Sequence, residues 1–137
     1  MADFKNAFLK GLNLAKKAET NIAEINEVIE TMSSQLSDLT DGKATLGIGK
    51  FYNDTANPLS RFTSDAKTHL ALAIYDGEGK NGTEVAEWTR DENGYPCTVS
   101  NDSGTFYCTN REELENTIAE LFTQTRTGKA ILKKMYN

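Results

Sequence analysis

The sequence is poor in the residue types that usually build a reactive or metal-binding centre. Its 137 residues include one histidine, His69, and two cysteines, Cys97 and Cys108. A structural zinc site takes four cysteine or histidine ligands, so these three residues cannot supply one. A catalytic triad would need a nucleophile brought to His69, and the sequence has no nucleophile-elbow motif. We therefore predict no catalytic residues, no metal and no cofactor, and we expect both cysteines to be buried, reduced thiols.

The sequence also lacks basic clusters and long apolar runs. Fifteen basic residues are outnumbered by 20 acidic ones, which gives a formal net charge of −5 and a pI near 4.9. Direct nucleic-acid binding depends on phosphate neutralisation by Lys and Arg, so this charge argues against it. No apolar run approaches about 18 residues, and the N-terminus lacks a signal-peptide pattern. We expect a cytoplasmic protein that binds neither nucleic acid nor membrane directly.

The most regular pattern is a heptad repeat in the first forty residues. From Phe4 onward, apolar residues or glycine recur in alternating steps of four and three, which predicts a coiled-coil-like helix over Asp3 to Thr40. Such a helix is about 55 Å long, whereas a compact chain of this size has a radius of gyration of about 14 Å. One chain therefore could not cover the apolar side of the helix from end to end. We predict an oligomerisation helix over residues 1–41 and a small α+β domain over 42–137. The predicted oligomer interface, thin around Gly11, comprises Phe4, Phe8, Ala15, Ala18, Ile22, Ile25, Ile29, Met32, Leu36 and Leu39.

Charge along this helix favours an antiparallel or bundled homo-oligomer. From Met1 to Ala18, four lysines and one aspartate give a net charge of +3, whereas Glu19 to Asp41 carries six acids and no base. An antiparallel neighbour places the basic half against the acidic half, although screening weakens this preference. Two alternatives stay open. The helix could break at Gly11 and pack on its own sheet, or its partner could be a different protein.

Alternating apolar residues predict an antiparallel meander of three to five strands. The predicted strands run from Ala44 to Tyr52, from Thr68 to Asp76 and from Thr83 to Arg90. The segment from Asn53 to Lys67 is polar and is expected to be a surface loop. Gly77 to Gly82 matches G-x-G-x-x-G, but the residues after it alternate with period two instead of opening a helix. We interpret it as a hairpin loop.

Two hairpins follow in the predicted meander. Asn93-Gly94 predicts a two-residue turn that pairs Glu92 with Tyr95 and Trp88 with Val99. A turn around Asp102 and Ser103 then pairs Cys97 with Cys108, which gathers the apolar residues of both strands on one face. A helix capped by Thr109 or Asn110 and a shorter one after Thr127-Gly128 are expected to cover one face of the sheet. The predicted fold class is α+β.

Six carboxylates cluster in sequence around the predicted hairpin loops. We predict an acidic partner surface made of Asp76, Glu78, Glu84, Glu87, Asp91 and Glu92. The leading functional hypothesis is a non-enzymatic, self-associating interaction or structural protein, compatible with a phage or mobile-element accessory protein. The alternative is a small acidic inhibitor that mimics nucleic acid and binds a basic, nucleic-acid-handling protein. A third hypothesis, a hydrolase, requires a pocket where several of His69, Tyr75, Glu84 and Glu87 converge.

Overall fold

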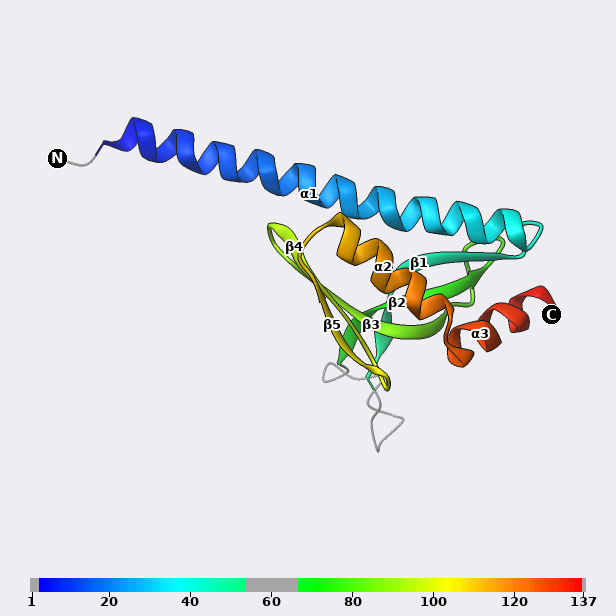
Figure 1. Cartoon of the computed structure of the whole chain (residues 1–137). Coiled ribbons are helices and arrows are strands. Elements are labelled where there is room, and N and C mark those ends of the chain that lie inside the picture. The colour runs from blue at the N-terminus through cyan, green and yellow to red at the C-terminus, as the bar shows by residue number, and fades with distance from the viewer. Residues whose placement is uncertain (1–2, 54–66, 137) are drawn as a thin grey trace.

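The computed structural model describes residues 3–53 and 67–136 and shows a long helix, a five-stranded sheet and two shorter helices (Figure 1). The elements are α1 (Phe4–Leu39), β1 (Ala44–Tyr52), β2 (Thr68–Asp76), β3 (Thr83–Asp91), β4 (Gly94–Asn101), β5 (Gly104–Cys108), α2 (Arg111–Phe122) and α3 (Thr125–Met135). The predicted α+β class and the three predicted strands are confirmed. The predicted loop after β1 lies largely outside the described residues.

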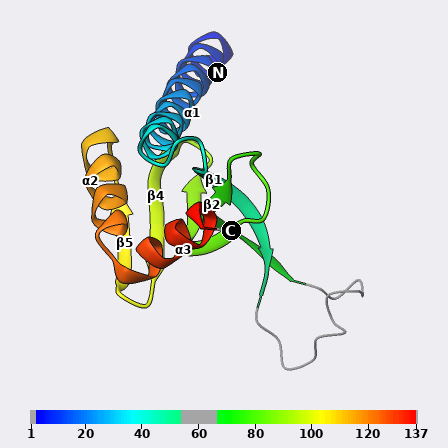
Figure 2. The same ribbon diagram turned by 90° about the vertical axis from the view of Figure 1, so that its right-hand side faces the viewer.

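The sheet is an antiparallel meander with strand order β1-β2-β3-β4-β5. All three helices lie against one of its faces, with α1 over β1 and β4, α2 along β5, and α3 over β2 and β3 (Figure 2). The core between these layers is built from fully buried side chains such as Ile25, Leu72, Ile74, Leu114 and Ile118. The C-terminal half of α1 therefore belongs to the same core as the sheet.

Helix α1 is continuous over its whole length and is not broken at Gly11. The Asp3 carboxylate caps its start by accepting a hydrogen bond from the Asn6 N–H. At its end, the Thr40 hydroxyl donates to the Leu36 carbonyl and accepts from the Ala44 N–H. This buried threonine joins the helix directly to β1. The predicted alternative of a helix broken at Gly11 is wrong, because the helix runs through that residue without a break and its N-terminal half stays exposed.

The β3–β4 hairpin differs from the predicted one by a change of register next to the turn. Trp88 pairs with Val99 as predicted, but Asp91 pairs with Gly94, so the predicted pair of Glu92 with Tyr95 is wrong. The Asp91 carboxylate accepts a hydrogen bond from the Asn93 N–H, which tightens the turn around Glu92 and Asn93. Gly94 follows with a left-handed φ of +96°, a conformation that glycine adopts without strain.

The β4–β5 hairpin has the predicted register. Cys97 faces Cys108 and Val99 faces Phe106. Both thiols are free and buried. Burial and the neighbouring Cys108 raise the pKa of Cys97 to about 12, so this thiol stays protonated near neutral pH.

The two C-terminal helices follow β5. Asn110 caps α2 by accepting from the Glu113 N–H. The break between α2 and α3 lies at Thr123 and Gln124, and the predicted break at Thr127-Gly128 is wrong because those residues lie inside α3. The Leu132 side chain of α3 is 53% exposed. Lys134 of the same helix faces inward, where it donates to the Asn81 carbonyl.

Candidate interaction surface and polar cleft

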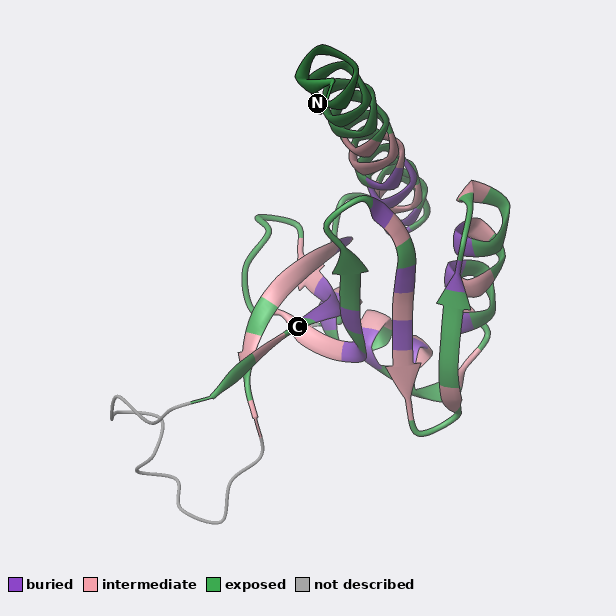
Figure 3. Cartoon of the chain, turned by 90° about the vertical axis from the view of Figure 1, so that its left-hand side faces the viewer, coloured by how far each residue is buried: buried purple, intermediate pink, exposed green. Residues whose placement is uncertain are grey.

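The N-terminal half of α1 extends beyond the rest of the molecule. We call residues 4–18 the arm and the remainder of the described chain the body. Every arm residue up to Lys17 is exposed, and Ala18 is partly buried. Figure 3 shows the arm as an exposed extension of a helix whose other half carries the buried residues. The large apolar side chains that the arm exposes are Phe4 (64%), Phe8 (68%), Leu9 (49%), Leu12 (58%) and Leu14 (56%).

The residues of the predicted oligomer interface are divided between the arm and the core. Ile25, Ile29 and Leu36 are buried beneath α1 in the chain's own core. Met32 packs against that core and Ile22 is half-buried. Leu39 is 83% exposed at the far end of the helix. The part of the predicted interface that projects from the body is Phe4, Phe8, Ala15 and Ala18, together with Gly11.

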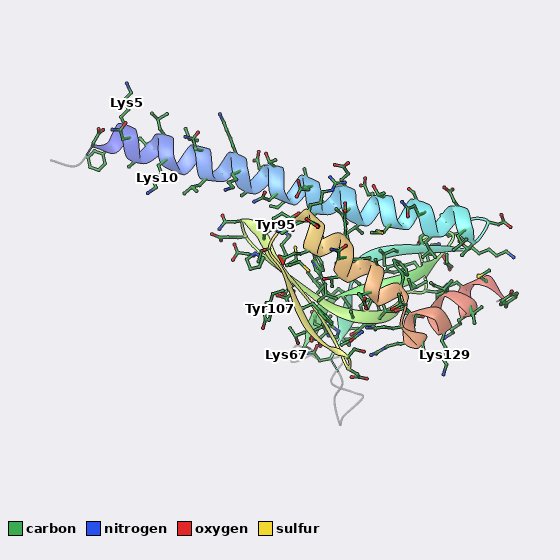
Figure 4. All side chains as sticks on the ribbon, viewed as in Figure 1. Lys5, Lys10, Lys67, Tyr95, Tyr107 and Lys129 are labelled. Carbon is green, nitrogen blue, oxygen red and sulfur yellow. The ribbon has the colours of Figure 1, made fainter. Side chains whose placement is uncertain are left out.

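Contacts with the β3–β4 hairpin mark the base of the arm. Asn21 donates from its side-chain amide to the Asn93 carbonyl at 3.0 Å, and the Tyr95 hydroxyl donates to Glu24 at 2.7 Å. Figure 4 shows Tyr95 beneath α1. Burial and the Glu24 carboxylate raise the pKa of Tyr95, which keeps this donor protonated. Gly94 lies so close to Asn21 that an added Cβ would come within 2.6 Å of the Asn21 Cβ. The hairpin thereby fixes where α1 leaves the body.

A groove of about 460 Å³ lies in the angle between the arm and this end of the body. Leu14 and Ala18 line it from the arm, and Tyr95 and Asn110 line it from the body. Acidic residues of the same end of the body, Asp91, Glu92 and Glu113, are exposed. The arm itself is basic, and Lys5 and Lys10 project from different sides of it (Figure 4). The arm and the end of the body at its base therefore carry opposite charge.

The six acids of the predicted partner surface lie in three separate places along β3. Asp76 ends β2 and Glu78 lies in the β2–β3 turn, Glu84 and Glu87 lie within β3, and Asp91 and Glu92 are at the β3–β4 turn. At about 3.3 Å per residue, the nine residues of β3 separate its two ends by roughly 25 Å. The first group serves its own turn, because the Asp76 carboxylate accepts from the N–H groups of Glu78 and Lys80. The G-x-G-x-x-G segment therefore uses its N–H groups for a hairpin, and β3 follows it rather than a helix.

A β-bulge in β3 brings the second group together. Ala73 pairs with Glu84 and Ala71 pairs with Glu87, with a register shift between them that leaves Val85 as an extra residue. Since Ala71 and Ala73 point to the same face of β2, the two glutamates also share that face. The Val85 carbonyl accepts a hydrogen bond from the Asn101 side chain. The bulge thus has a specific partner in β4.

His69 lies on the same face, two residues before Ala71. Its Nε2 is 2.9 Å from Glu84 Oε1, and its Nδ1 is 2.6 Å from Asn53 Oδ1. The ligand-capable atoms of His69, Glu84 and Glu87 all lie within 4.8 Å of one another. They border a cleft of about 530 Å³ that Tyr52, Ser100 and Arg126 also line. Three of the four residues named by the hydrolase hypothesis therefore converge.

The fourth residue, Tyr75, does not line the cleft. Its ring lies against Gly47, Gly49 and Gly82, where a Cβ at any of the three positions would collide with it or crowd it. Desolvation raises the pKa of its hydroxyl. Tyr75 fills the space above three glycines and has a packing role.

The cleft opens where the sheet divides into two ribbons. Thr68 to Leu70 of β2 pair only with β1, while Trp88 to Asp91 of β3 pair only with β4. The β1–β2 ribbon consequently diverges from the strands beside it (Figure 2). The sequence analysis assigned no site role to Asn53, which contacts His69, or to Tyr52, Ser100 and Arg126, which line the cleft. The adjacent apolar pair Val85-Ala86, which interrupts the alternation of β3, is the one local sign of the bulge.

Comparisons with other proteins provide no relative for this arrangement. No family model, curated protein or solved structure matches the chain. Within residues 3–53 and 67–136, no helix combines the length and the apolar character needed to cross a bilayer. The function therefore has to be argued from the arm and the cleft themselves.

Proposed function

We propose that the protein self-associates through the arm, which pairs antiparallel with the arm of a second copy. The observation that carries this proposal is the exposure of five large apolar side chains on four helical turns that no described part of the chain covers. Soluble monomers rarely expose a contiguous apolar surface of this kind. Its proposed role is to join two bodies into a structural or interaction unit.

The arm is large enough for such a contact. Residues 4–18 form about 22 Å of helix at 1.5 Å per residue. Phe4, Phe8, Leu12 and Leu14 lie at the d, a, e and g positions of the heptad, whereas Leu9 lies at an outer b position. Burying these four side chains on each of two copies removes on the order of 1,000 Å² of apolar surface, near the lower limit for a specific interface. Contacts between each arm and the partner's body would add to this area.

The distribution of side-chain size favours an antiparallel pair centred on Gly11. In that register, Phe4 of one copy lies level with Ala18 of the other, and Phe8 lies within one residue, about 1.5 Å along the axis, of the level of Ala15. Large side chains then face small ones, which fills an interface more evenly than opposing rings with rings. Gly11 lies at the centre, where an added Cβ would meet nothing within 4 Å in the chain itself. Its lack of a side chain leaves space for close approach by a second helix.

Charge acts in both directions in this arrangement, because the two basic arms repel each other while the tip of each arm meets acids on the partner's body. An arm that reaches back along its partner brings its tip, with Lys5, to the end of the partner's body that carries Asp91, Glu92 and Glu113. Opposite charges at such a rim favour the correct orientation more than they add affinity. The same acids, and the five acids of α1 from Glu19 onward, would repel an anionic bilayer, so a second copy is favoured over a membrane as the occupant.

The proposal is tested by the molar mass of the full chain in sedimentation equilibrium at tens of micromolar. The native chain is expected to form dimers or a larger even-numbered assembly. Phe8→Asp is expected to weaken association by about thirtyfold or more, because a central aromatic side chain typically contributes about 2 kcal/mol or more.

Leu39→Asp is the matched control, because Leu39 is an apolar, 83% exposed residue of the same helix outside the arm. It should associate like the native chain. A monomeric native chain, or equal loss of association in both variants, would overturn the proposal. Binding of a monomeric chain to anionic vesicles, abolished by Phe8→Asp, would instead assign the arm to a bilayer.

A further inference from the structure

We infer that the cleft is a binding site for a divalent first-row transition-metal ion, held by Nε2 of His69 and the carboxylates of Glu84 and Glu87. The sequence alone argues against a metal site, because only one histidine is present. The structure supplies two carboxylates instead of further histidine or cysteine ligands. This inference is independent of self-association through the arm.

The surroundings of His69 carry the first step. Both ring nitrogens face oxygen acceptors, Nδ1 toward Asn53 Oδ1 and Nε2 toward Glu84 Oε1. A neutral imidazole has one N–H donor and one lone pair, so it can satisfy only one of these contacts. When Nδ1 donates to Asn53, the Nε2 lone pair points at a carboxylate oxygen. In that tautomer, a cation placed between the two atoms would bind both of them.

The role of Asn53 matches that of an outer-shell residue in known metal sites. A metal-bound histidine usually donates its second N–H to an oxygen acceptor, which fixes both the tautomer and the orientation of the ring. Asn53 Oδ1 is 2.6 Å from Nδ1 and can do this. His69 also lies against Phe51, with ring centroids 6.4 Å apart. The ring is therefore positioned from two sides, and Nε2 faces the glutamates.

The distances suit a small cation. With bonds of about 2.0–2.2 Å, the ligand atoms of a four-coordinate zinc ion lie about 3.4 Å apart. Nε2 and Glu84 Oε1 are 2.9 Å apart, and the whole set lies within 4.8 Å. Glu84 is 26% exposed, and Glu87 is exposed and can rotate inward without disturbing the core. One nitrogen and two carboxylate oxygens select first-row ions such as Zn²⁺ or Mn²⁺.

The bulge explains why the two glutamates form one site. In a regular strand, Glu84 and Glu87 are three positions apart and would point to opposite faces. Val85 and Ala86 are both buried, and the register shift between them and β2 turns both glutamates toward His69. Bulges often re-aim side chains in this way beside functional sites. Three protein ligands leave the fourth position facing the cleft, where water or another ligand can bind.

The test is a titration of the full chain with Zn²⁺, Mn²⁺ or Co²⁺. Binding is measured by calorimetry and, for Co²⁺, also by visible absorption. The native chain is expected to bind one ion, with a Co²⁺ spectrum typical of nitrogen and oxygen ligands. Glu87→Gln should weaken binding at least tenfold. Its fold should be unaffected because Glu87 is exposed. His69→Gln should abolish binding, and Asn53→Ala should weaken it by about 10- to 100-fold through the loss of the outer-shell contact.

Glu78→Gln is the matched control, since Glu78 is an exposed acid outside the cleft. Thermal unfolding of each variant without metal checks that it is folded. The inference is overturned if the native chain binds none of the three ions at millimolar concentration. It is also overturned if the Glu87 and Glu78 variants bind equally well, because the ion would then lie elsewhere.

Discussion

The two halves of α1 carry the same heptad pattern but have different surroundings. In the C-terminal half, the apolar seam is buried against the sheet, with Ile25 1% exposed. In the arm, the seam is exposed, with Phe8 68% exposed. The two halves meet where the β3–β4 hairpin contacts Asn21. A heptad pattern therefore shows that one face of a helix will be covered, while the extent of the neighbouring sheet determines which part is covered by the chain itself.

The largest expected effect separates the two halves by their contribution to the stability of one chain. Ile25→Ala should lower the free energy of unfolding by about 2–5 kcal/mol, because it leaves a cavity in the core. Phe8→Ala should change it by no more than about 0.5 kcal/mol in dilute solution, where the arms are apart. Urea unfolding at submicromolar protein concentration measures both. Similar losses in the two variants would show that the arm folds against the body.

The orientation of the arms gives the next test of the comparison. If they pair antiparallel about Gly11, mixing Phe4→Cys and Ala18→Cys chains under oxidation should produce a cross-linked heterodimer, since the two thiols come level. Phe4→Cys alone should cross-link poorly. The native cysteines do not interfere because both are buried. Denaturing electrophoresis of chains with different tags distinguishes the products, and efficient cross-linking of Phe4→Cys with itself would indicate a parallel pair.

The smallest effect concerns charge at the tip of the arm. Lys5→Glu should weaken association by only about two- to fivefold, because a solvent-exposed ion pair contributes about 0.2–1 kcal/mol. The loss should shrink at high salt as the charges are screened. Lys129→Glu, an exposed site on α3 (Figure 4), provides the control. Sedimentation equilibrium at two salt concentrations measures the difference, and an equal loss for both variants would exclude a contact specific to the tip.

Much of the fold follows from local patterns in the sequence. Alternation identified β1, β2 and β3, and the shared apolar face of the cysteines fixed the register of β4 and β5. The division of α1 could not be predicted, because Phe8 and Ile29 occupy equivalent heptad positions and only the sheet distinguishes them. The turn was placed one residue too far along the chain, because the Asp91 side chain binds the Asn93 N–H and centres a two-residue turn on Glu92 and Asn93.

The cleft was only partly predictable. The sequence named His69, Glu84 and Glu87 as residues that an enzyme would bring together, but it offered no reason for them to meet. Regular alternation places Glu84 and Glu87 on opposite faces of β3. Only the pairing with β2 shows that Val85 is an extra residue. Asn53 gave no signal, because its role depends on the position of the His69 ring.

The unbroken course of α1 has a mechanical consequence. Between Leu12 and Leu39 the helix contains no glycine or proline, and no kink separates the arm from the core. The hairpin contacts at Asn21 and Glu24 fix its direction from the body side. A stiff helix held in this way sets the distance between the two bodies that it joins. Two copies joined by their arms would hold their clefts at a set spacing, so that the assembly would favour ligands or partners whose own sites repeat at that distance.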